Sequence, residues 1–262
     1  MTKIIRLIIV AFVVFSCDNT KKEIPQEPPI SSEVIEKEPD KPEMTRIWAP
    51  KPARVIPGNG IIQPSDAIVL FDGGNLDEWV SKNDGSVAKW QLNEDGSMTV
   101  IPGTGDIQTK KTFGSVQLHI EWKSPSEIIG DGQDRGNSGI YFQKRYEIQI
   151  LDNNDNETYV NGQAGAIYKQ SIPLVNAVVA TGEWNSYDII FHAPKFDANG
   201  IKTASGTFTV LHNGILIQDH VEIKGSTEDI GWPKNIAHGD AAIVLQDHSC
   251  KVSYRNIWLR NL

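Results

Sequence analysis

Several features that mark particular classes of protein are rare in this sequence or absent from it. Only two of its 262 residues are cysteine, so a framework of disulfide bonds is not expected to hold the fold. No segment keeps the 3.6-residue apolar period of a long helix and no unit of sequence repeats, which excludes helical bundles and solenoid arrays. The apolar run from Leu7 to Phe15 is too short to span a bilayer as a helix.

Positive charge is also scarce. Residues 65–262 contain 16 Lys and Arg against 25 Asp and Glu, a net charge of −9. This balance disfavours nucleic acid as a partner. The chain is long enough, and at 39% hydrophobic residues apolar enough, to form one sizeable domain with its own core.

Residues 1–17 have the features of a bacterial export signal. Two basic residues precede the apolar run, and the last four residues resemble a lipobox, in which Cys17 receives a diacylglycerol and becomes the new N-terminus. Phe15 departs from the small residue usual at its position, so an ordinary signal peptide or an uncleaved anchor stays open. We expect an exported protein that is lipid-anchored to a cell-envelope membrane, on the periplasmic side or at the cell surface.

A change in composition separates this signal from the folded region. Nine of the fourteen prolines lie before residue 65, mixed with Glu, Lys and Ser and with almost no aromatic residues. Such a segment cannot bury enough apolar surface to fold. We therefore predict a disordered, partly polyproline tether over residues 18–64 and a domain over residues 65–262.

Short alternating segments predict that this domain is almost entirely strand and turn. In Val116–Trp122 apolar residues take every second position, and Asn213-Gly214 between two such segments is the strongest hairpin signal in the chain. Cys250, without a disulfide partner once Cys17 is lipidated, is expected to be a small buried strand residue. Ten or more strands in about two hundred residues indicate a β-sandwich or a barrel.

Two further strands are expected in Gly136–Asp152. Asn137 and Ser138 are predicted to form the turn before the first strand. The second alternates, which places Glu147 and Gln149 on the face opposite its apolar residues. We expect this polar face to be exposed, either as a solvated sheet surface or as part of a binding site.

Polar residues recur in the same way along several strands. If those strands are neighbours in a curved sheet, their polar faces line one concave surface suited to sugar hydroxyls. The polar positions are His119 and Glu121, Glu147 and Gln149, Asp188 and His192, Gln246 and His248, and Ser253 and Arg255. Nearby aromatic residues could offer stacking faces; any one of them alone fits the core better, but as a set they favour a carbohydrate ligand: Trp122, Tyr141, Tyr168, Trp184 and Trp232.

Ala67–Leu262 contains the ordered blocks LFDGGNLDEW (70–79), GNSGIYFQ (136–143), YEIQILD (146–152), GAIY (165–168), EWNSYDIIF (183–191), VLHNG (210–214), LQDHS (245–249) and YRNIW (254–258). Together these blocks resemble the 3-keto-disaccharide hydrolase domain family. The resemblance implies a concanavalin A-like jelly roll in an exported bacterial protein. It also implies a carbohydrate substrate, a glycoside whose C3 hydroxyl has been oxidised to a ketone by a separate sugar 3-dehydrogenase acting upstream.

The chemistry that this family implies needs three groups. A C3 ketone acidifies the C2 proton, so a base can remove it, an acid can protonate the departing C1 oxygen, and a donor must stabilise the enolate. We assign Glu147 and His248 to proton transfer and Arg255 to the enolate. The alternative for His248 is a histidine that is simply hydrogen-bonded within a sheet. The alternative for Arg255 is a salt bridge that holds the last strand in place. Substrate-binding residues are expected to be Glu121, Asn137, Ser138, Gln149, Tyr168, Glu183, Trp184 and Gln246.

No cofactor is firmly indicated. A divalent metal in place of the arginine stays open if four long-range residues converge, but no compact ligand motif is present. Those residues are His119, Glu121, Glu147 and His248. The acidic loop at residues 152–157 lacks the glycine and the distal glutamate of a calcium-binding EF-hand, so a solvated turn is expected.

Two other functions stay open. A laminarinase-type glycosidase would use Glu147 and Asp152 as its acidic pair, but Gln149 stands between them and the two acids have opposite parity along the strand. A surface lectin that binds glycans without cleaving them would have the same fold.

Overall fold

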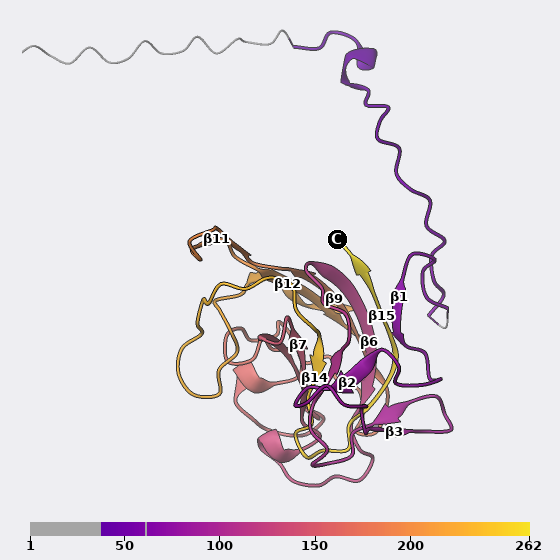
Figure 1. Cartoon of the computed structure of the whole chain (residues 1–262), viewed down its shortest axis with the longest axis vertical. Helices are drawn as coiled ribbons and strands as arrows, with labels where there is room; N and C mark the ends of the chain where they lie inside the picture. Colours follow the sequence, from indigo (N-terminus) through magenta and orange to yellow (C-terminus); the bar gives the residue numbers. More distant parts are fainter. Residues whose placement is uncertain (1–37, 61) are drawn as a thin grey trace, which may run out of the picture. The chain divides into compact units, whose positions relative to one another are not determined.

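The computed structural model describes residues 38–60 and 62–262 (Figure 1). The chain divides at Pro52 into two compact units. Described residues 38–52 of the first unit are exposed and contain one short 3-10 helix, η1 (Pro42–Thr45). The predicted signal, Cys17 and residues 18–37 of the predicted tether lie outside the described residues. No helix within 38–60 or 62–262 is both long and apolar enough to cross a membrane.

The second unit, Ala53–Leu262, begins before the predicted domain start at Ser65. Residues of its first segment are hydrogen-bonded to the domain. Ser65 N donates to Ile56 O at 3.0 Å, and Gln63 Nε2 donates to Asn256 Oδ1 at 3.2 Å. The last part of the segment predicted as a tether is therefore part of the folded unit.

This unit is an all-β sandwich of antiparallel strands, as predicted (Figure 1). The larger sheet has eight strands in the order β13-β12-β9-β6-β15-β4-β3, with β1 also paired to β15. Its strands are β1 (Ile68–Phe71), β3 (Gln91–Leu92), β4 (Met98–Thr99), β6 (Val116–Lys123), β9 (Asn185–His192), β12 (Thr207–His212), β13 (Ile215–Glu222) and β15 (Ser253–Asn261).

The smaller sheet has five strands in the order β2-β5-β14-β7-β8. Two short strands, β10 (Lys195–Phe196) and β11 (Lys202–Ala204), pair separately, and two further 3-10 turns are η2 (Gly132–Asp134) and η3 (Val160–Gly162). The strands of the smaller sheet are β2 (Trp79–Ser81), β5 (Ile107–Thr109), β7 (Ser138–Phe142), β8 (Tyr146–Ile150) and β14 (Val244–Leu245).

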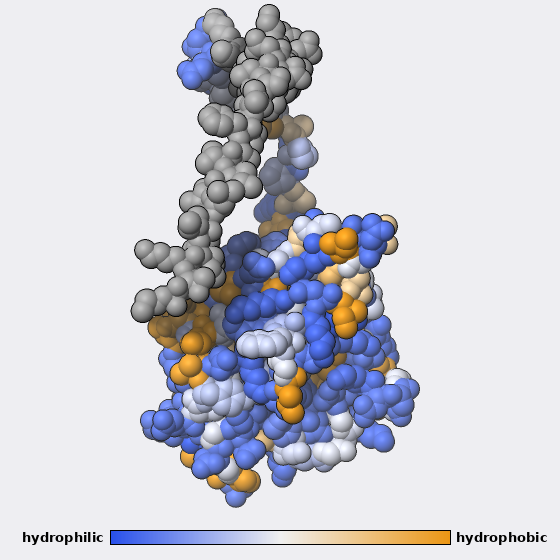
Figure 2. Space-filling model, turned by 90° about the vertical axis from the view of Figure 1, so that its left-hand side faces the viewer, coloured by the Kyte–Doolittle hydropathy of each residue, from blue (hydrophilic) through white to orange (hydrophobic). Residues whose placement is uncertain are grey.

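The alternation of the sequence explains how the two sheets pack. Strand β6 buries every second side chain, and its outward side chains are half-exposed. Aromatic side chains from both sheets meet in the core, where the rings of Phe142 and Phe191 lie 4.9 Å apart. Outside the core the surface is hydrophilic over most of the face in Figure 2, with hydrophobic residues in separate patches. Each sheet therefore has one buried face and one outward face.

The hairpin between β12 and β13 turns at Asn213-Gly214 as predicted. Both residues have positive φ, 52° and 76°, which is the backbone of the two-residue turn that fits the twist of paired strands. The prediction for Ser138 was wrong, because β7 already begins there and its side chain points into the core.

The outward face of β8 is buried, contrary to expectation. Glu147 and Gln149 are only 3% and 1% exposed. The chain after β8 returns beside it, where Gln149 N donates to Ala166 O at 3.0 Å, and the β13–β14 connection crosses it at Thr227. Sequence periodicity does not show that two long connections fold over a strand.

Candidate functional site

A pocket of about 140 Å³ lies on the outward face of the smaller sheet. Strand register builds its floor, since Tyr141 of β7 lies opposite Glu147 of β8, and Gly139 lies opposite Gln149. The two long connections and the chain after β14 supply the walls. We call this site the Glu147 pocket; it is lined by Asn137, Tyr141, Glu147, Gln149, Tyr168, Thr227, Asp229, Gln246 and His248.

Gly139 makes room for the central carboxyl group. A Cβ atom at this position would overlap Oε1 of Glu147 and lie 3.0 Å from the ring of Tyr141. A larger residue would therefore displace Glu147 from the pocket floor. The glycine in the middle of β7 is explained by the shape of the site.

Glu147 has an unusual electrostatic environment. Its burial raises the pKa of the carboxyl group from 4.5 to about 8, against the opposing effect of the Tyr141 hydroxyl. The negative charge of Asp106 adds to the upward shift, whereas Lys169 lowers the pKa. A carboxyl group with this pKa exchanges a proton near neutral pH and, once ionised, is a much stronger base than an exposed glutamate.

Neutral amide groups surround this carboxyl. In one amide orientation Gln149 Nε2 donates to Gln133 Oε1 at 3.1 Å, and in the other it donates to Glu147 Oε1 and to Ser138 O, both at 3.2 Å. Gln246 Nε2 donates to Tyr141 Oη at 3.3 Å, while its buried Oε1 has no hydrogen-bond partner among the described residues. An unpaired buried acceptor on the pocket wall is suited to a hydroxyl group of a ligand.

Ser138 acts beneath the pocket rather than inside it. Its hydroxyl donates to Gln246 O at 2.6 Å and accepts from the Tyr254 hydroxyl at 2.6 Å. Ser138 therefore positions the backbone of Gln246, and the predicted direct contact with substrate is wrong because the side chain faces inward.

The rim of the pocket carries an ion pair and an exposed histidine. Asp229 Oδ1 accepts a hydrogen bond from Lys169 Nζ at 2.7 Å, and this bond lowers the pKa of Asp229. His248 is exposed and faces the same pocket. Thr227 joins wall to floor, because its Oγ1 accepts from Glu147 N at 3.0 Å.

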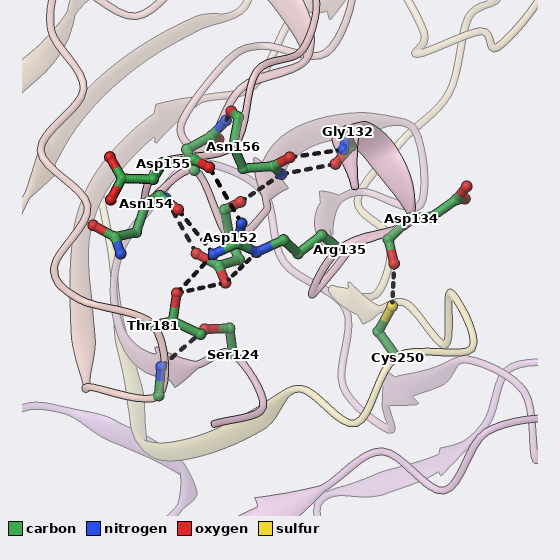
Figure 3. A network of polar contacts seen from close by, with 12 residues as sticks. Ser124, Gly132, Asp134, Arg135, Asp152, Asn154, Asp155, Asn156, Thr181 and Cys250 are labelled. Atoms are coloured by element: carbon green, nitrogen blue, oxygen red, sulfur yellow. Dashed lines mark hydrogen bonds and ion pairs between the residues drawn. The ribbon is translucent and has the colours of Figure 1, made fainter. Parts of the chain in front are cut away.

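A buried ion pair holds the loop that leads into β7 (Figure 3). Arg135 Nε donates to Asp152 Oδ2 at 2.9 Å, and Asp152 also accepts from Thr181 Oγ1 at 2.9 Å. Arg135 Nη2 donates to Asn154 O at 2.8 Å. The pair fixes the segment in which Asn137 Nδ2 donates to Gln133 O at 2.6 Å. Because Asp152 is committed to Arg135, it cannot form an acidic pair with Glu147.

Comparison with known proteins identifies the family. Residues 66–260 match the family model of the 3-keto-alpha-glucoside-1,2-lyase-like domain. The chain belongs to this family. A solved structure of a candidate glycosyl hydrolase from Parabacteroides distasonis is 49% identical, with a TM-score of 0.81, and the match covers 85% of this chain and 97% of that one.

A second candidate glycosyl hydrolase from the same organism shows the same fold at 23% identity and a TM-score of 0.54, over 75% of this chain and 94% of that one. No curated protein matches the chain. Membership in the lyase-like family supports a carbohydrate-active, glycosidase-like function.

The other predicted site residues of this lyase-like domain lie on the opposite side of the sandwich. Arg255 Nε donates to Glu121 Oε2 at 2.6 Å on the outward face of the larger sheet. Trp184 packs over the guanidinium group of Arg255, 4.2 Å from its carbon to the ring centre. The expectation of one shared concave surface is therefore wrong, because β6 and β15 belong to one sheet and β7 and β8 to the other. Glu183 is exposed just before β9 and does not line the Glu147 pocket.

The outward face of the larger sheet carries a network of paired charges. Burial lowers the pKa of His119, but hydrogen bonds to Asp188 and Glu121 outweigh it and raise that pKa to about 9. Burial likewise raises the pKa of Glu121, whereas bonds from His119, Asn256 and Arg255 bring it down to about 2. These groups satisfy one another as a structural network.

The residues suggested as metal ligands do not converge, because His119 and Glu121 lie on one face and Glu147 and His248 on the other. Within residues 38–60 and 62–262 no three His, Cys, Asp or Glu side chains are placed to hold an ion.

The loop at residues 152–157 is partly buried rather than fully solvated. Cys250 is half-buried in a bend, not in a strand, and its Sγ lies 3.5 Å from Asp134 O (Figure 3).

The sequence reasoning missed part of the Glu147 pocket. Thr227 and Asp229 lie in the β13–β14 connection, where no periodic pattern marks them. Tyr141 was considered only as a stacking face, yet it lies opposite Glu147. Its position two residues after Gly139 is the signal that places it on the outward side of β7.

Proposed function

We propose that this lyase-like domain cleaves the glycosidic bond of 3-keto-glycosides and 3-keto-disaccharides by elimination followed by addition of water. The observation that carries the proposal is Glu147, a buried carboxyl group with its pKa raised to about 8 on the floor of a neutral, amide-lined pocket. Family membership supports the same chemistry.

The reaction balances as a proton cycle. Ionised Glu147 takes the C2 proton, and the C2–H electron pair forms an enolate with the C3 carbonyl. The enolate collapses to a C1=C2 double bond as the C1–O bond breaks, and the leaving oxygen takes a proton from His248. Water then adds to C1 and returns a proton to His248, while Glu147, whose carboxyl proton has exchanged with solvent after the leaving group departed, protonates C2. No oxocarbenium ion or covalent intermediate is required.

The remaining groups of the Glu147 pocket match the other needs of this reaction. Asn137 and Gln246 each use one amide hydrogen within the protein, to Gln133 O and to Tyr141 Oη, and the second amide hydrogen of each can bond the enolate oxygen or a sugar hydroxyl. His248 at the exposed rim is the group we assign to proton transfer with the leaving oxygen. Arg255 has no part in this assignment, since it is paired with Glu121 on the other sheet.

Product analysis of the full-length protein tests the proposal. Wild-type protein and the Glu147→Gln variant are incubated with matched native and 3-keto disaccharides, and products are separated by chromatography and weighed by mass spectrometry. We expect cleavage of the 3-keto sugar alone, and only by the wild type. Cleavage of the native sugar would point to a two-carboxylate glycosidase, and binding without cleavage of either sugar would point to a lectin.

We also propose that the protein is exported and anchored through lipid on Cys17, and that a sugar 3-dehydrogenase supplies its substrate. The support is the signal-like pattern of residues 1–17 and the need for an oxidised C3. In cells, a Cys17→Ala variant should move from the membrane fraction to the soluble fraction or remain unprocessed. Unchanged fractionation and mass would contradict the anchor.

A further inference from the structure

A second hollow of about 370 Å³ adjoins the Glu147 pocket, and Tyr168 lines both. The ion pair of Lys169 and Asp229 also joins them, because Lys169 lines the second hollow and Asp229 lines the pocket. We call this site the Trp232 hollow; its other residues include Tyr159, Asn161, Gln170, Glu228 and Pro233. The two cavities are therefore neighbouring parts of one surface.

Trp232 presents an unusually large apolar face to solvent. Its side chain is 88% exposed, and no ring stacks on it within the described part of the chain. Exposed tryptophan is the side chain best suited to pack against the C–H face of a pyranose ring. Across the hollow, the hydroxyls of Tyr159 and Tyr168 are bonded at 2.6 Å.

The loop that carries Trp232 is held in place although its tip is exposed. Ser226 N donates to Lys234 O at 2.9 Å, and Lys234 N returns a bond to Ser226 Oγ at 3.3 Å. Glu228 adds bonds from Ser226 Oγ at 2.8 Å and Lys234 Nζ at 3.1 Å. The loop is closed upon itself, so the backbone that carries Trp232 is held in place before a ligand arrives, which reduces the entropy lost on binding.

The volumes of the two cavities indicate which part of the substrate each one binds. About 140 Å³ accommodates one sugar ring at most, so the group on C1 must lie outside the Glu147 pocket. The Trp232 hollow is more than twice as large and opens beside Tyr168. We infer that the Trp232 hollow is the leaving-group subsite, and that a second pyranose ring stacks on Trp232 while the oxidised ring lies over Glu147. This inference rests on the proposed function for the identity of the oxidised ring.

Kinetics with two leaving groups test it in the full-length protein. In the Trp232→Ala variant, kcat/KM for a 3-keto disaccharide should fall about tenfold more than kcat/KM for the corresponding methyl 3-keto-glycoside, which has no second ring. Trp232→Phe should restore most of the difference. Ile201→Ala, which removes another exposed apolar side chain in the connection between β10 and β11, should behave as wild type. Equal losses for the two substrates, or no loss for either, would overturn the inference.

A binding measurement separates this inference from the proposed reaction. The native disaccharide is titrated into Glu147→Gln and into Glu147→Gln combined with Trp232→Ala by calorimetry. About tenfold weaker binding in the double variant supports the subsite even if no 3-keto sugar is turned over, in which case the proposed reaction alone fails. Equal affinities would contradict the stacking role of Trp232.

Discussion

The outward faces of the two sheets carry similar residues in opposite states. On the larger sheet, Glu121 is bonded by Arg255 at 2.6 Å and its pKa is held near 2. On the smaller sheet, no cationic side chain of residues 38–60 or 62–262 forms an ion pair with Glu147, and burial raises its pKa to about 8. Charged groups that are paired with one another stabilise a surface, but they are poorly suited to transfer a proton to or from a substrate. A carboxyl group kept near its neutral form marks the reactive face.

The largest expected difference between the two faces is in turnover. Glu147→Gln keeps the shape of the side chain but removes the base, so kcat for the 3-keto substrate should fall by about 10²–10⁴-fold. Glu121→Gln makes the same chemical change on the other face and should stay within about twofold of wild type. Steady-state kinetics on both variants measure the two changes in kcat. A loss at Glu121 equal to that at Glu147 would move the site to the larger sheet.

The second difference concerns stability. The Arg135 and Asp152 side chains are 10% and 2% exposed, so Arg135→Met leaves a buried carboxylate unpaired and should lower the free energy of unfolding by about 3 kcal/mol. Arg255→Met removes a cation whose side chain is 40% exposed and should cost about 1 kcal/mol or less. Urea unfolding measures both. Similar losses of unfolding free energy in the two variants would show that the Arg135–Asp152 pair does not stabilise the fold more than the Arg255–Glu121 pair does.

Glu147 should also make stability and activity depend on pH. Its pKa is raised from 4.5 to about 8, so ionisation in the unfolded chain destabilises the fold progressively between these values. The Glu147→Gln variant does not have this loss. The difference in free energy of unfolding between the variant and wild type should therefore shift in favour of the variant by about 2–4 kcal/mol from pH 4 to pH 9. For wild type, kcat/KM should rise with pH and level off above pH 8, because the base must be ionised. A flat activity profile from pH 6 to 9 would contradict the role of Glu147 as the base.

His119 should produce the smallest effect. Its pKa is raised from 6.5 to about 9, so its contribution is fully present below pH 6.5 and is lost as pH rises through 9. His119→Gln should remove about 1 kcal/mol of stability at pH 6 and less at pH 9.5, without changing the pH dependence of turnover. Thermal unfolding at several pH values measures this. A changed activity profile would connect His119 to the reaction.

Alternation in the sequence predicted the sandwich, the hairpin at Asn213-Gly214 and the outward direction of Glu147 and Glu121. It did not distinguish their sheets, because period-two patterns give the direction of a side chain and not the neighbours of its strand. The burial of Glu147 arises from the return of residues 165–168 beside β8 and from Thr227 of a distant connection. Those contacts depend on tertiary folding of loops that carry no periodic signal.

The origin of the hydrogen at C2 of the product is the most direct test of the account. Wild-type protein is given a 3-keto disaccharide in D₂O, and the product is examined by NMR after short reaction times. The same product incubated with the Glu147→Gln variant controls for uncatalysed exchange beside the ketone. Elimination and rehydration predict deuterium at C2 of each newly formed 3-keto sugar. Cleavage with the original hydrogen retained at C2, and with an unchanged rate when C2 of the substrate carries deuterium, would contradict proton removal by Glu147 and indicate direct displacement at C1.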